Sequence, residues 1–459
     1  MTHCPRRLWY EKNPPDGIES LELDPFETLV AEMGLVHERA VRDRLASEME
    51  LVEAVSADHT RDLMDAGVPA IYQAELHDEA NDLLGKPDFL LLQNDGSYRP
   101  ADAKLARSLK REIGVQLAFY RRLLGTEHTG VVYLGDGNVV EVGEDYNPHL
   151  NTFIIEARSL LNDAERPEVF FSASKCNVCP FKAICVPEFE ERDDLSLLYD
   201  LRSVSIPRLN GVGIETISDL AATDPTDIPE NIPWLKGDRK ERVVLQAQAV
   251  KQGTMFKRGE IALPEGTYVH FDIETNPLAP DGNEHVYLWG FLKPPYNEAN
   301  FDAIWTDTHE DDRAGWDAFL GMVEAYRDEW PNLKLVHFSN YERRMIRDYA
   351  QRYDMEEHPT VAWLLDSDGP LYDIQDAVTD NLVLPLSGYG LKAIAKHPDL
   401  VNFQWEDTES GSQWSVVQYV NFLNATDEGE REALKASILG YNRDDVMATY
   451  MLEQWLRTL

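Results

Sequence analysis

The chain has 459 residues, of which 82 are acidic and 43 are basic, so its formal net charge is −39. A content of 43% hydrophobic residues with 10 Trp and 19 Tyr is enough for packed cores, which excludes an acidic disordered regulator. No stretch approaches the roughly 18 uninterrupted apolar residues of a membrane span, and the amino terminus has no signal-peptide core, so we expect a protein of the cytoplasm.

The acid excess also predicts the solvent in which the protein works. Self-repulsion of this size would strain a compact fold and repel nucleic acid in dilute buffer. At roughly molar salt the Debye length is only about 3 Å, so repulsion beyond immediate neighbours is screened. We therefore interpret the acidity as the solvating surface of a halophile's protein, from an archaeon.

Length and local composition divide the chain into three expected parts. The charged stretch 188–194 marks the end of the first domain, which we place at residues 1–190. Residues 195–255, with Pro and Gly punctuation, predict a helical connector. The third domain, residues 260–459, opens with the apolar strand Thr267 to Ile273.

All four cysteines fall into one pattern. Cys4 stands alone near the amino terminus, and Cys176, Cys179 and Cys185 follow as C-x2-C-x5-C. Four thiolates with none left over suit an iron-sulfur cluster or a tetrahedral zinc site. Either would join both ends of the first domain. The alternative is four unrelated buried thiols, since free cysteine packs like a small hydrophobe.

Residues suited to a divalent metal lie between the lone cysteine and the triplet. His37 belongs to a helical stretch expected to start at Gly34, and Asp88 stands in a turn before an apolar strand. After a hairpin turn the chain returns through Asp102 and Lys104, which share one face because they are residues i and i+2 of a strand. We therefore expect Asp102 and Lys104 to point into the same site as Asp88.

The chemistry of metal-assisted hydrolysis calls for this set of side chains. Two carboxylates and an imidazole can hold Mg²⁺ or Mn²⁺, which polarises a phosphate and generates hydroxide, while a lysine steadies the water or the developing charge. Gln116 and Tyr120 are i, i+4 neighbours on the next helix and could reach DNA or order Lys104. Glu75, before Asp88, is interpreted as a solvated or structural acid. Each of these residues taken singly also has an ordinary structural explanation.

The ordered series, ending in the cysteine triplet, resembles the RecB-type branch of the PD-(D/E)xK nucleases. The resemblance is to the CRISPR-associated RecB-like exonucleases, whose four cysteines hold a [4Fe-4S] cluster, and it covers residues 1–190. It implies a restriction-endonuclease-like fold with an iron-sulfur clasp. The roles it implies are metal ligands at His37, Asp88 and Asp102, catalytic side chains at Lys104, Gln116 and Tyr120, and cluster ligands at Cys4, Cys176, Cys179 and Cys185.

The connector contains a weaker pattern. Residues 207–220, with Gly211-Val212-Gly213, resemble a helix-hairpin-helix element, whose glycines would let backbone N–H groups approach a DNA phosphate. The segment lacks supporting basic residues, so a plain helical hairpin remains an alternative.

The third domain carries a second set of acids. Asp272 and Glu274 share one face at the end of an apolar strand, and Glu342 stands in the first turn of a helix that follows another strand. Near the carboxyl end, Tyr441 and Asp445 are i, i+4 neighbours. Four acids and a tyrosine can hold two divalent ions about 3.5 to 4 Å apart, which clamp the attacking and leaving oxygens of a phosphodiester. The alternative for each acid is ordinary surface charge.

This second pattern resembles the ribonuclease-H-like DEDD exonucleases of the tyrosine subclass over residues 260–459. It implies a 3′–5′ exonuclease domain with metal ligands at Asp272, Glu274, Glu342 and Asp445 and a water-orienting Tyr441. Glu342 replaces the usual Asp, as in the RecB-associated ribonuclease-H-like group, and Asp373 is the competing candidate. Residues 386–392 resemble the Ser-Tyr-x-Leu-Lys segment of that group, which implies that Lys392 meets a phosphate.

Together these features predict an α/β protein and a metal-dependent nuclease with two active sites. Its expected reaction is cleavage of DNA phosphodiesters, exonucleolytic and on single strands or ends, in repair, recombination or defence. The expected cofactors are a [4Fe-4S] cluster and Mg²⁺ or Mn²⁺. RNA as a substrate and a helicase or repair partner remain open. The alternatives are a nucleic-acid-binding scaffold of a repair complex with one or both sites silent, and a zinc-stapled RNA-processing exonuclease.

Overall fold

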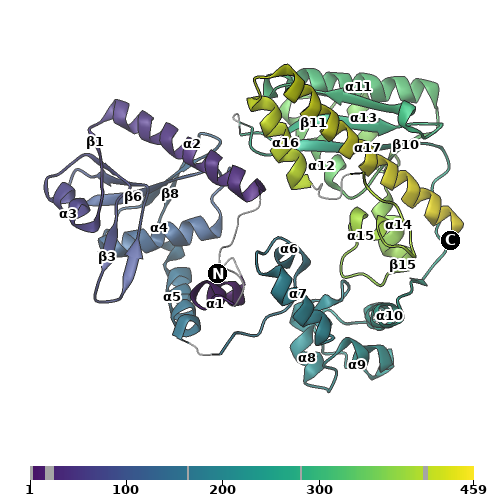
Figure 1. Ribbon diagram of the computed structural model, residues 1–459, viewed down its shortest axis with the longest axis horizontal. Coiled ribbons are helices and arrows are strands. Elements are labelled where there is room, and N and C mark those ends of the chain that lie inside the picture. Colours follow the sequence, from purple (N-terminus) through teal and green to yellow (C-terminus); the bar gives the residue numbers. More distant parts are fainter. Residues whose placement is uncertain (1–3, 16–24, 163–164, 280–281, 407–411) are drawn as a thin grey trace. The chain divides into compact units, whose positions relative to one another are not determined.

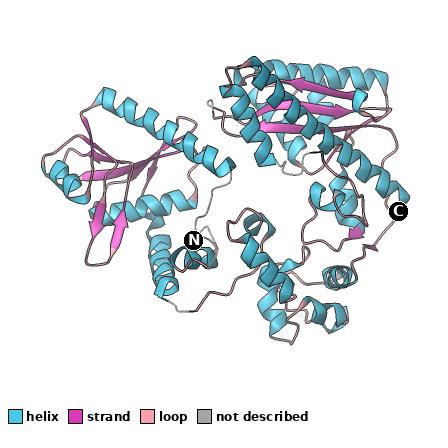
Figure 2. Cartoon of the chain, in the orientation of Figure 1, coloured by secondary structure: helices cyan, strands magenta, loops and turns pink. Residues whose placement is uncertain are grey.

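The computed structural model describes residues 4–15, 25–162, 165–279, 282–406 and 412–459. The chain divides into two compact units, Met1–Val169 with Pro277–Glu284, and Phe170–Asn276 with His285–Leu459. Both units combine helices with strands, in agreement with the expected α/β class (Figures 1 and 2). Among the described helices, none has the length and apolar character needed to cross a membrane.

The first unit is built on a six-stranded sheet with the order β1-β2-β5-β6-β7-β8. Its strands are β1 (Leu51–Glu53), β2 (Ala70–Tyr72), β5 (Phe89–Leu92), β6 (Tyr98–Lys104), β7 (Gly130–Leu134) and β8 (Val139–Val142). The pairs β1–β2 and β6–β7 are parallel and the other neighbours are antiparallel. A separate hairpin pairs β3 (Leu76–Asp78) with β4 (Leu83–Gly85).

Helices cover both faces of this sheet (Figure 1). The helical elements of this unit are α1 (Pro5–Lys12), α2 (Pro25–Glu48), α3 (Ala57–Asp65), α4 (Arg111–Leu124), η1 (Glu144–Tyr146) and α5 (Asn147–Asn162). Helix α2 packs against Ala101 and Ala103 of β6. Helix α4 packs on Val132 and Leu134, which share the opposite face with Asp102 and Lys104 of the paired strand. The alternation of β6 therefore turns its two polar residues toward α4.

The expected start of the His37 helix at Gly34 is wrong. The described part of α2 begins at Pro25, and Gly34 lies inside it. A single glycine in a helix interior costs only about 1 kcal/mol, which a long helix packed on a sheet tolerates.

A helical segment opens the second unit. Its elements are α6 (Ala173–Cys176), α7 (Lys182–Glu191), η2 (Leu195–Leu197), η3 (Ser203–Ser205), α8 (Ile206–Asn210), α9 (Ile217–Ala222), η4 (Pro225–Asp227) and α10 (Asp238–Gln252). Residues from η2 to α10 enclose a core of their own that includes Leu209, Leu220 and Val243. The expected hairpin is formed by α8 and α9, and Thr216 begins α9 with a capping box to Asp219.

The rest of the second unit is built on a five-stranded sheet with the order β12-β11-β10-β13-β14. The strands are β10 (Thr267–Asn276), β11 (His285–Leu292), β12 (Phe301–Trp305), β13 (Leu333–His337) and β14 (Leu371–Asp373), and β9 (Phe256–Lys257) pairs separately with β15 (Leu382–Val383). Strand β10 is antiparallel to β11 and parallel to β13, which is parallel to β14.

Helices pack on both faces of this sheet as well (Figure 1). The helical elements are η5 (Glu298–Asn300), η6 (His309–Asp311), α11 (Asp312–Glu329), α12 (Tyr341–Arg352), α13 (Pro359–Leu365), α14 (Ile374–Asn381), α15 (Leu391–Ala395), α16 (Ser412–Asn424) and α17 (Glu428–Thr458). Val269, Phe271 and Ile273 of β10 lie in the core formed with α11, α12 and α13. Because side chains alternate along a strand, Asp272 and Glu274 lie on the opposite face, which α17 crosses.

Two candidate metal centres

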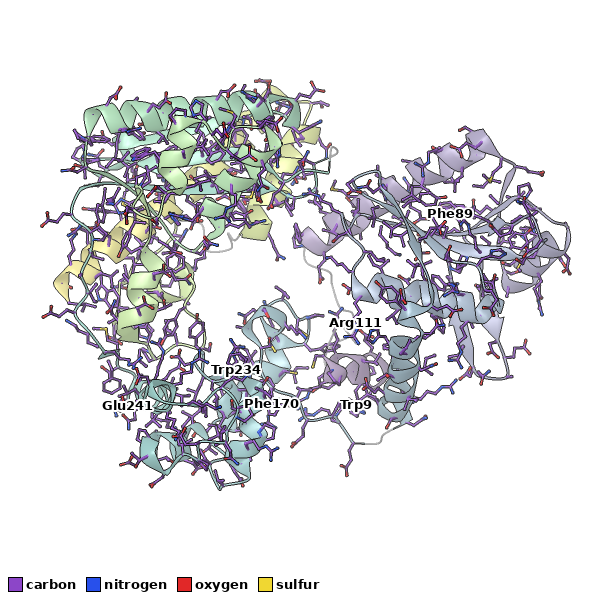
Figure 3. The ribbon with its side chains drawn as sticks, turned by 180° about the vertical axis from the view of Figure 1, so that it is seen from behind. Trp9, Phe89, Arg111, Phe170, Trp234 and Glu241 are labelled. Carbon is purple, nitrogen blue, oxygen red and sulfur yellow. The ribbon has the colours of Figure 1, made fainter. Side chains whose placement is uncertain are left out.

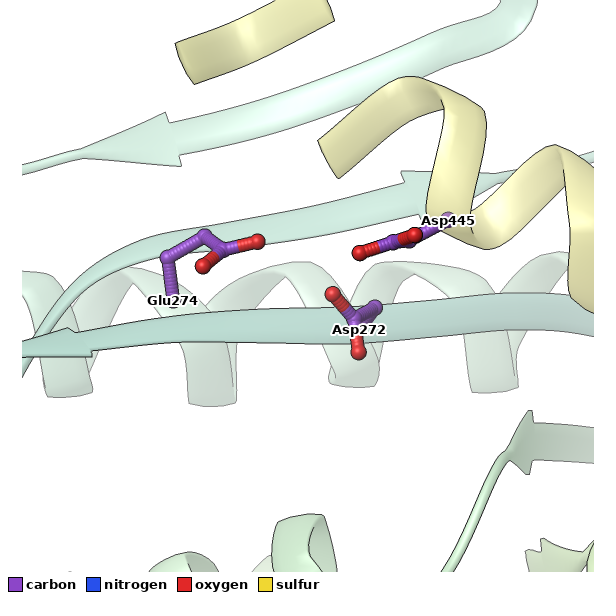
Figure 4. Close-up of side chains that lie close together, drawn as sticks. All are labelled: Asp272, Glu274 and Asp445. Carbon is purple, nitrogen blue, oxygen red and sulfur yellow. The ribbon is translucent and has the colours of Figure 1, made fainter. Parts of the chain in front are cut away.

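Three carboxylates converge where α17 crosses β10. One oxygen from each of Asp272, Glu274 and Asp445 lies within 4.8 Å of the others (Figure 4). In the described part of the chain this is the one group of three or more His, Cys, Asp or Glu side chains that meets this distance. Two of the three acids therefore lie on one face of strand β10. The third comes from helix α17, far along the sequence.

Burial and mutual repulsion raise the pKa of all three acids. Burial and the charge of Asp445 raise the pKa of Glu274 to about 8. Burial raises the pKa of Asp445 to about 6, although Lys392 opposes the shift. Burial and the charges of Asp445 and Glu274 hold the pKa of Asp272 well above its usual range. A divalent cation would remove this repulsion, and carboxylate oxygens are the ligands that Mg²⁺ prefers, so the donor set fits such an ion.

Neutral donors orient these carboxylates. The contacts are Asn442 Nδ2 to Asp272 Oδ2 at 2.8 Å, Ser415 Oγ to Glu274 Oε2 at 2.6 Å and Trp405 Nε1 to Asp445 Oδ1 at 2.7 Å. None of these three donors was predicted from the sequence. Asn442 directly follows Tyr441, which was a usable signal, whereas Ser415 and Trp405 lie in segments without a recognisable motif.

Tyr441 and Lys392 lie beside Asp445. Tyr441 is buried, and burial together with the nearby acids, Asp445 first, strongly raises the pKa of its hydroxyl. The ammonium of Lys392 is 4.5 Å from the centre of the Tyr441 ring. Burial lowers the pKa of Lys392 more than the acids raise it. The two side chains place a hydroxyl and a cation next to the carboxylates.

The two candidates for the fourth acid have different surroundings. Glu342 is 2% exposed in the first turn of α12, and its Oε2 lies 3.3 Å from Nδ1 of His337. Glu342 contributes to the raised pKa of Asp272 through its charge and a hydrogen bond, so the two groups are neighbours. Asp373 Oδ1 instead accepts the N–H groups of Ser339 (2.8 Å) and Gln375 (3.0 Å), and caps α14. The structure thus brings Glu342 to the acids and gives Asp373 a local structural role.

Asp88, Asp102 and Lys104 meet in the first unit. Asp102 Oδ1 accepts the N–H of Asp88 at 3.0 Å, and Asp88 Oδ2 accepts the N–H of Ala103 at 2.8 Å. Lys104 Nζ lies 3.0 Å from Asp102 Oδ2. Burial and the charge of Asp102 raise the pKa of Asp88 to about 7. Burial lowers the pKa of Lys104, but Asp102 and Asp88 raise it more, so the lysine stays charged.

Two neighbouring side chains of α2 were candidates for this site, and the structure links only Glu38 to its aspartates. Nε2 of His37 lies 3.0 Å from the carbonyl oxygen of Tyr133. Glu38 accepts a hydrogen bond from the hydroxyl of Tyr72 at 2.7 Å, and its charge contributes to the raised pKa of both aspartates. His37 was predicted from the sequence as a ligand, and Glu38 was not. The signal was present, because Glu38 is an acid one residue further along the same helix.

Gln116 and Tyr120 contact each other rather than Lys104. Gln116 Nε2 donates to the Tyr120 hydroxyl at 2.8 Å, which donates to the carbonyl oxygen of Lys86 at 3.0 Å. Both residues therefore support the turn that leads into Asp88. Glu75 forms an ion pair with Lys86 at 2.8 Å, in agreement with a structural or solvated acid.

The four cysteines form no disulfide. Cys4 is the N-cap residue of α1 in the first unit. The triplet belongs to the second unit, with Cys176 at the end of α6 and Cys185 in α7, and the N–H of Cys179 donates to the carbonyl oxygen of Cys176 at 3.2 Å. Each thiol is partly exposed. The three sulfur atoms of the triplet do not all lie within 4.8 Å of one another, so the structure does not gather them into a metal site.

Comparison with protein families assigns both ends of the chain. Residues 7–186 match the PD-(D/E)XK nuclease superfamily, and residues 269–457 match the RNase_H superfamily. No curated protein matches the chain. The first match contains both aspartates, Lys104 and the cysteine triplet but begins after Cys4, and the second contains the three converging carboxylates.

Proposed function

Because residues 7–186 and 269–457 each belong to a nuclease superfamily, we propose that the protein is a metal-dependent nuclease with two active sites. Its substrate in this proposal is DNA, cleaved from ends or in single strands during repair, recombination or defence. The observation that supports the proposal most is the convergence of Asp272, Glu274 and Asp445. Three neighbouring carboxylates, two of them buried and one half-buried, are costly to ionise together without a cation, and a site that keeps them is suited to hold one.

In the second domain the three converging acids, completed by Glu342, would hold the divalent ions. Bound ions of this kind polarise a phosphate and lower the pKa of water. The hydroxyl of Tyr441 would orient the attacking water from its place beside Asp445. The ammonium of Lys392 would meet the negative charge of the phosphate.

In the first domain Asp88 and Asp102 would hold Mg²⁺ or Mn²⁺ with a third ligand from α2, either His37 or Glu38. Lys104, which Asp102 keeps charged, would steady the water or the charge that develops on the phosphate. Gln116 and Tyr120 would act through the turn that positions Asp88.

We further propose that Cys4, Cys176, Cys179 and Cys185 hold a [4Fe-4S] cluster. The set of four thiols is complete, and three of them lie within ten residues. Protein purified without air should be brown and contain iron and sulfide in equal amounts, and Cys4→Ser should lower the iron content and destabilise the first domain. Colourless protein with one bound zinc would contradict the cluster.

A digestion of end-labelled DNA and RNA, single- and double-stranded, tests the activity with Mg²⁺ or Mn²⁺ in buffers of rising KCl. Asp102→Ala and Lys104→Ala should abolish one activity, and Asp272→Ala and Asp445→Ala the other, because each change disables one metal site. A double variant, Asp102→Ala with Asp272→Ala, that cleaves as fast as the parent would contradict both site assignments. Cleavage of RNA alone would favour an RNA-processing exonuclease, and binding without cleavage a scaffold.

A further inference from the structure

The helical segment displays an exposed tryptophan from a rigid loop. Trp234 is 48% exposed and has a φ of +65°, a conformation that bulky residues rarely adopt. Ile232 and Leu235 on either side of it are buried in the core of the segment. The carbonyl oxygen of Pro233 accepts a hydrogen bond from Ser205 Oγ at 2.5 Å. The loop is thus held on both sides of the indole, which Figure 3 shows among these helices.

Two guanidinium groups lie against this indole. The guanidinium carbon of Arg202 is 3.8 Å from the ring centroid and that of Arg239 is 5.6 Å away. Both arginines are exposed, as is Lys236, which follows two residues after the tryptophan. None of these three cations forms an ion pair with another residue that the structure describes.

Unpaired cations stand out in this chain, whose net charge is −39. The other basic residues of α10 have acidic partners: Lys240 with Glu230, Arg242 with Asp200 at 2.7 Å and Lys251 with Asp193 at 3.3 Å. The exposed acids on the same helix, Asp238 and Glu241, lie in its first turn, where a carboxylate stabilises the helix end. The cations around Trp234 are therefore available to an anionic partner.

We propose that Arg202, Trp234, Lys236 and Arg239 form a docking surface for single-stranded nucleic acid. An unpaired base would stack on the indole or on a guanidinium beside it, and the neighbouring phosphates would meet the cations. Base–aromatic stacking tolerates any sequence and needs a base that is not already stacked in a duplex. This surface rests on the proposed function for its reason to bind a strand, but it uses neither metal site.

The surface also supplies what the hairpin of α8 and α9 lacks. Residues 207–220 contain few basic side chains, so that pattern alone gave weak support for DNA binding. Arg202 precedes the hairpin, and Lys236 and Arg239 follow it by more than a dozen residues. The fold brings Arg202 and Arg239 to the same ring.

Binding of a labelled oligothymidylate to the full chain in EDTA tests this surface, because no cleavage can occur without divalent metal. Trp234→Ala should weaken binding about tenfold, while Trp234→Tyr should keep most of the affinity because it retains an aromatic face. Arg239→Gln should also weaken binding and lower the slope of log affinity against log salt by about 0.7. Lys251→Gln is the matched control, since it removes one paired charge from the same helix and should leave binding unchanged.

A strand with abasic sugars separates stacking from charge. The parent should bind it about tenfold more weakly than oligothymidylate, and Trp234→Ala should bind both equally. Two outcomes would overturn this surface. One is that Trp234→Ala and the double variant Arg202→Gln with Arg239→Gln, both folded, bind the strand as tightly as the parent does. The other is that the parent binds only duplex DNA. If the strand binds through Trp234 yet no metal supports cleavage, the proposed function fails and the docking surface stands.

Discussion

Asn442 of α17 donates from Nδ2 to Oδ2 of Asp272 on β10 at 2.8 Å, and so joins the two elements that carry the converging acids. Gly290 of the neighbouring strand lies against the same amide. A Cβ at residue 290 would collide with Oδ1 of Asn442. The orientation of Asp272 therefore depends on the glycine at position 290 of the neighbouring strand β11.

Gly290→Ala should displace the Asn442 amide and lower the second activity at least tenfold, because Asp272 loses the donor that orients it. The measurement is cleavage by an Asp102→Ala background, in which the first site is silent. Gly321→Ala is the control, since no atom lies within 4 Å of its added Cβ on α11. It should be neutral or raise stability by up to about 1 kcal/mol. Equal activity of both variants would contradict this role of Asn442.

Asp272→Asn should raise the melting temperature in EDTA, because the parent must either ionise Asp272 beside two buried acids or bind a proton there, and asparagine needs neither. The rise should be about 2 to 4 °C for each kcal/mol of repulsion relieved. Added Mn²⁺ should stabilise the parent by ligand linkage and stabilise the variant less. Asp348→Asn, which removes a surface acid paired with Arg344, is the control and should change little. A destabilised Asp272→Asn in EDTA would show that repulsion is not the main cost at this site.

Glu342→Gln should abolish the second activity as Asp272→Ala does, because Glu342 is, of the two candidates for the fourth acid, the one that neighbours Asp272. Asp373→Asn should be mild, since asparagine caps a helix about as well as aspartate. Asp373→Ala should instead lower stability by about 1 kcal/mol and keep most of the cleavage. Cleavage rates and thermal unfolding measured together distinguish the roles. The reverse ranking would move the metal ligand to Asp373.

Because of Asp312, the free energy of unfolding should decrease in acid. Burial raises its pKa, but hydrogen bonds from His285, Tyr349 and Tyr353 lower it further, to about 2. The folded pKa is below the unfolded value, so the contribution is complete above about pH 4 and is lost as the pH falls through about 2.

Asp312→Asn should accordingly lower the free energy of unfolding by roughly 2 kcal/mol at neutral pH, and the gap should close between about pH 4 and 2. Denaturant unfolding at a series of pH values measures it. Asp317→Asn on the same helix is the control, because its exposed pair with Arg313 should contribute less than about 1 kcal/mol. A gap that is independent of pH would contradict the assignment.

The acidic surface predicts a gain of structure and activity as KCl rises toward molar concentration, because screening removes the repulsion among 82 acids. Circular dichroism and cleavage over a KCl series measure the effect. Phosphate contacts weaken with salt in ordinary DNA-binding proteins, so a halophilic enzyme should show the opposite trend overall. Best stability and activity at low salt would remove the halophilic interpretation.

Local periodicity accounts for what the sequence by itself determined. Residues i and i+2 of a strand share a face, so spacing alone pairs Asp102 with Lys104 and Asp272 with Glu274. Residues i and i+4 of a helix are neighbours in the same way, as Gln116 and Tyr120 are. The strands and helices that carry them follow from apolar runs and turn residues.

Only the tertiary structure decided which residues meet across elements. His37 and Glu38 stand side by side on α2, and Glu342 and Asp373 are both acids beside strand ends, so local pattern could not rank either pair. Packing places the charge of Glu38 near the aspartates and that of Glu342 near Asp272. Ser415 donates to Glu274 across 141 residues. Such contacts depend on how a whole helix or strand packs on the sheet. Many buried contacts together determine that packing, so no single segment of the sequence predicts it.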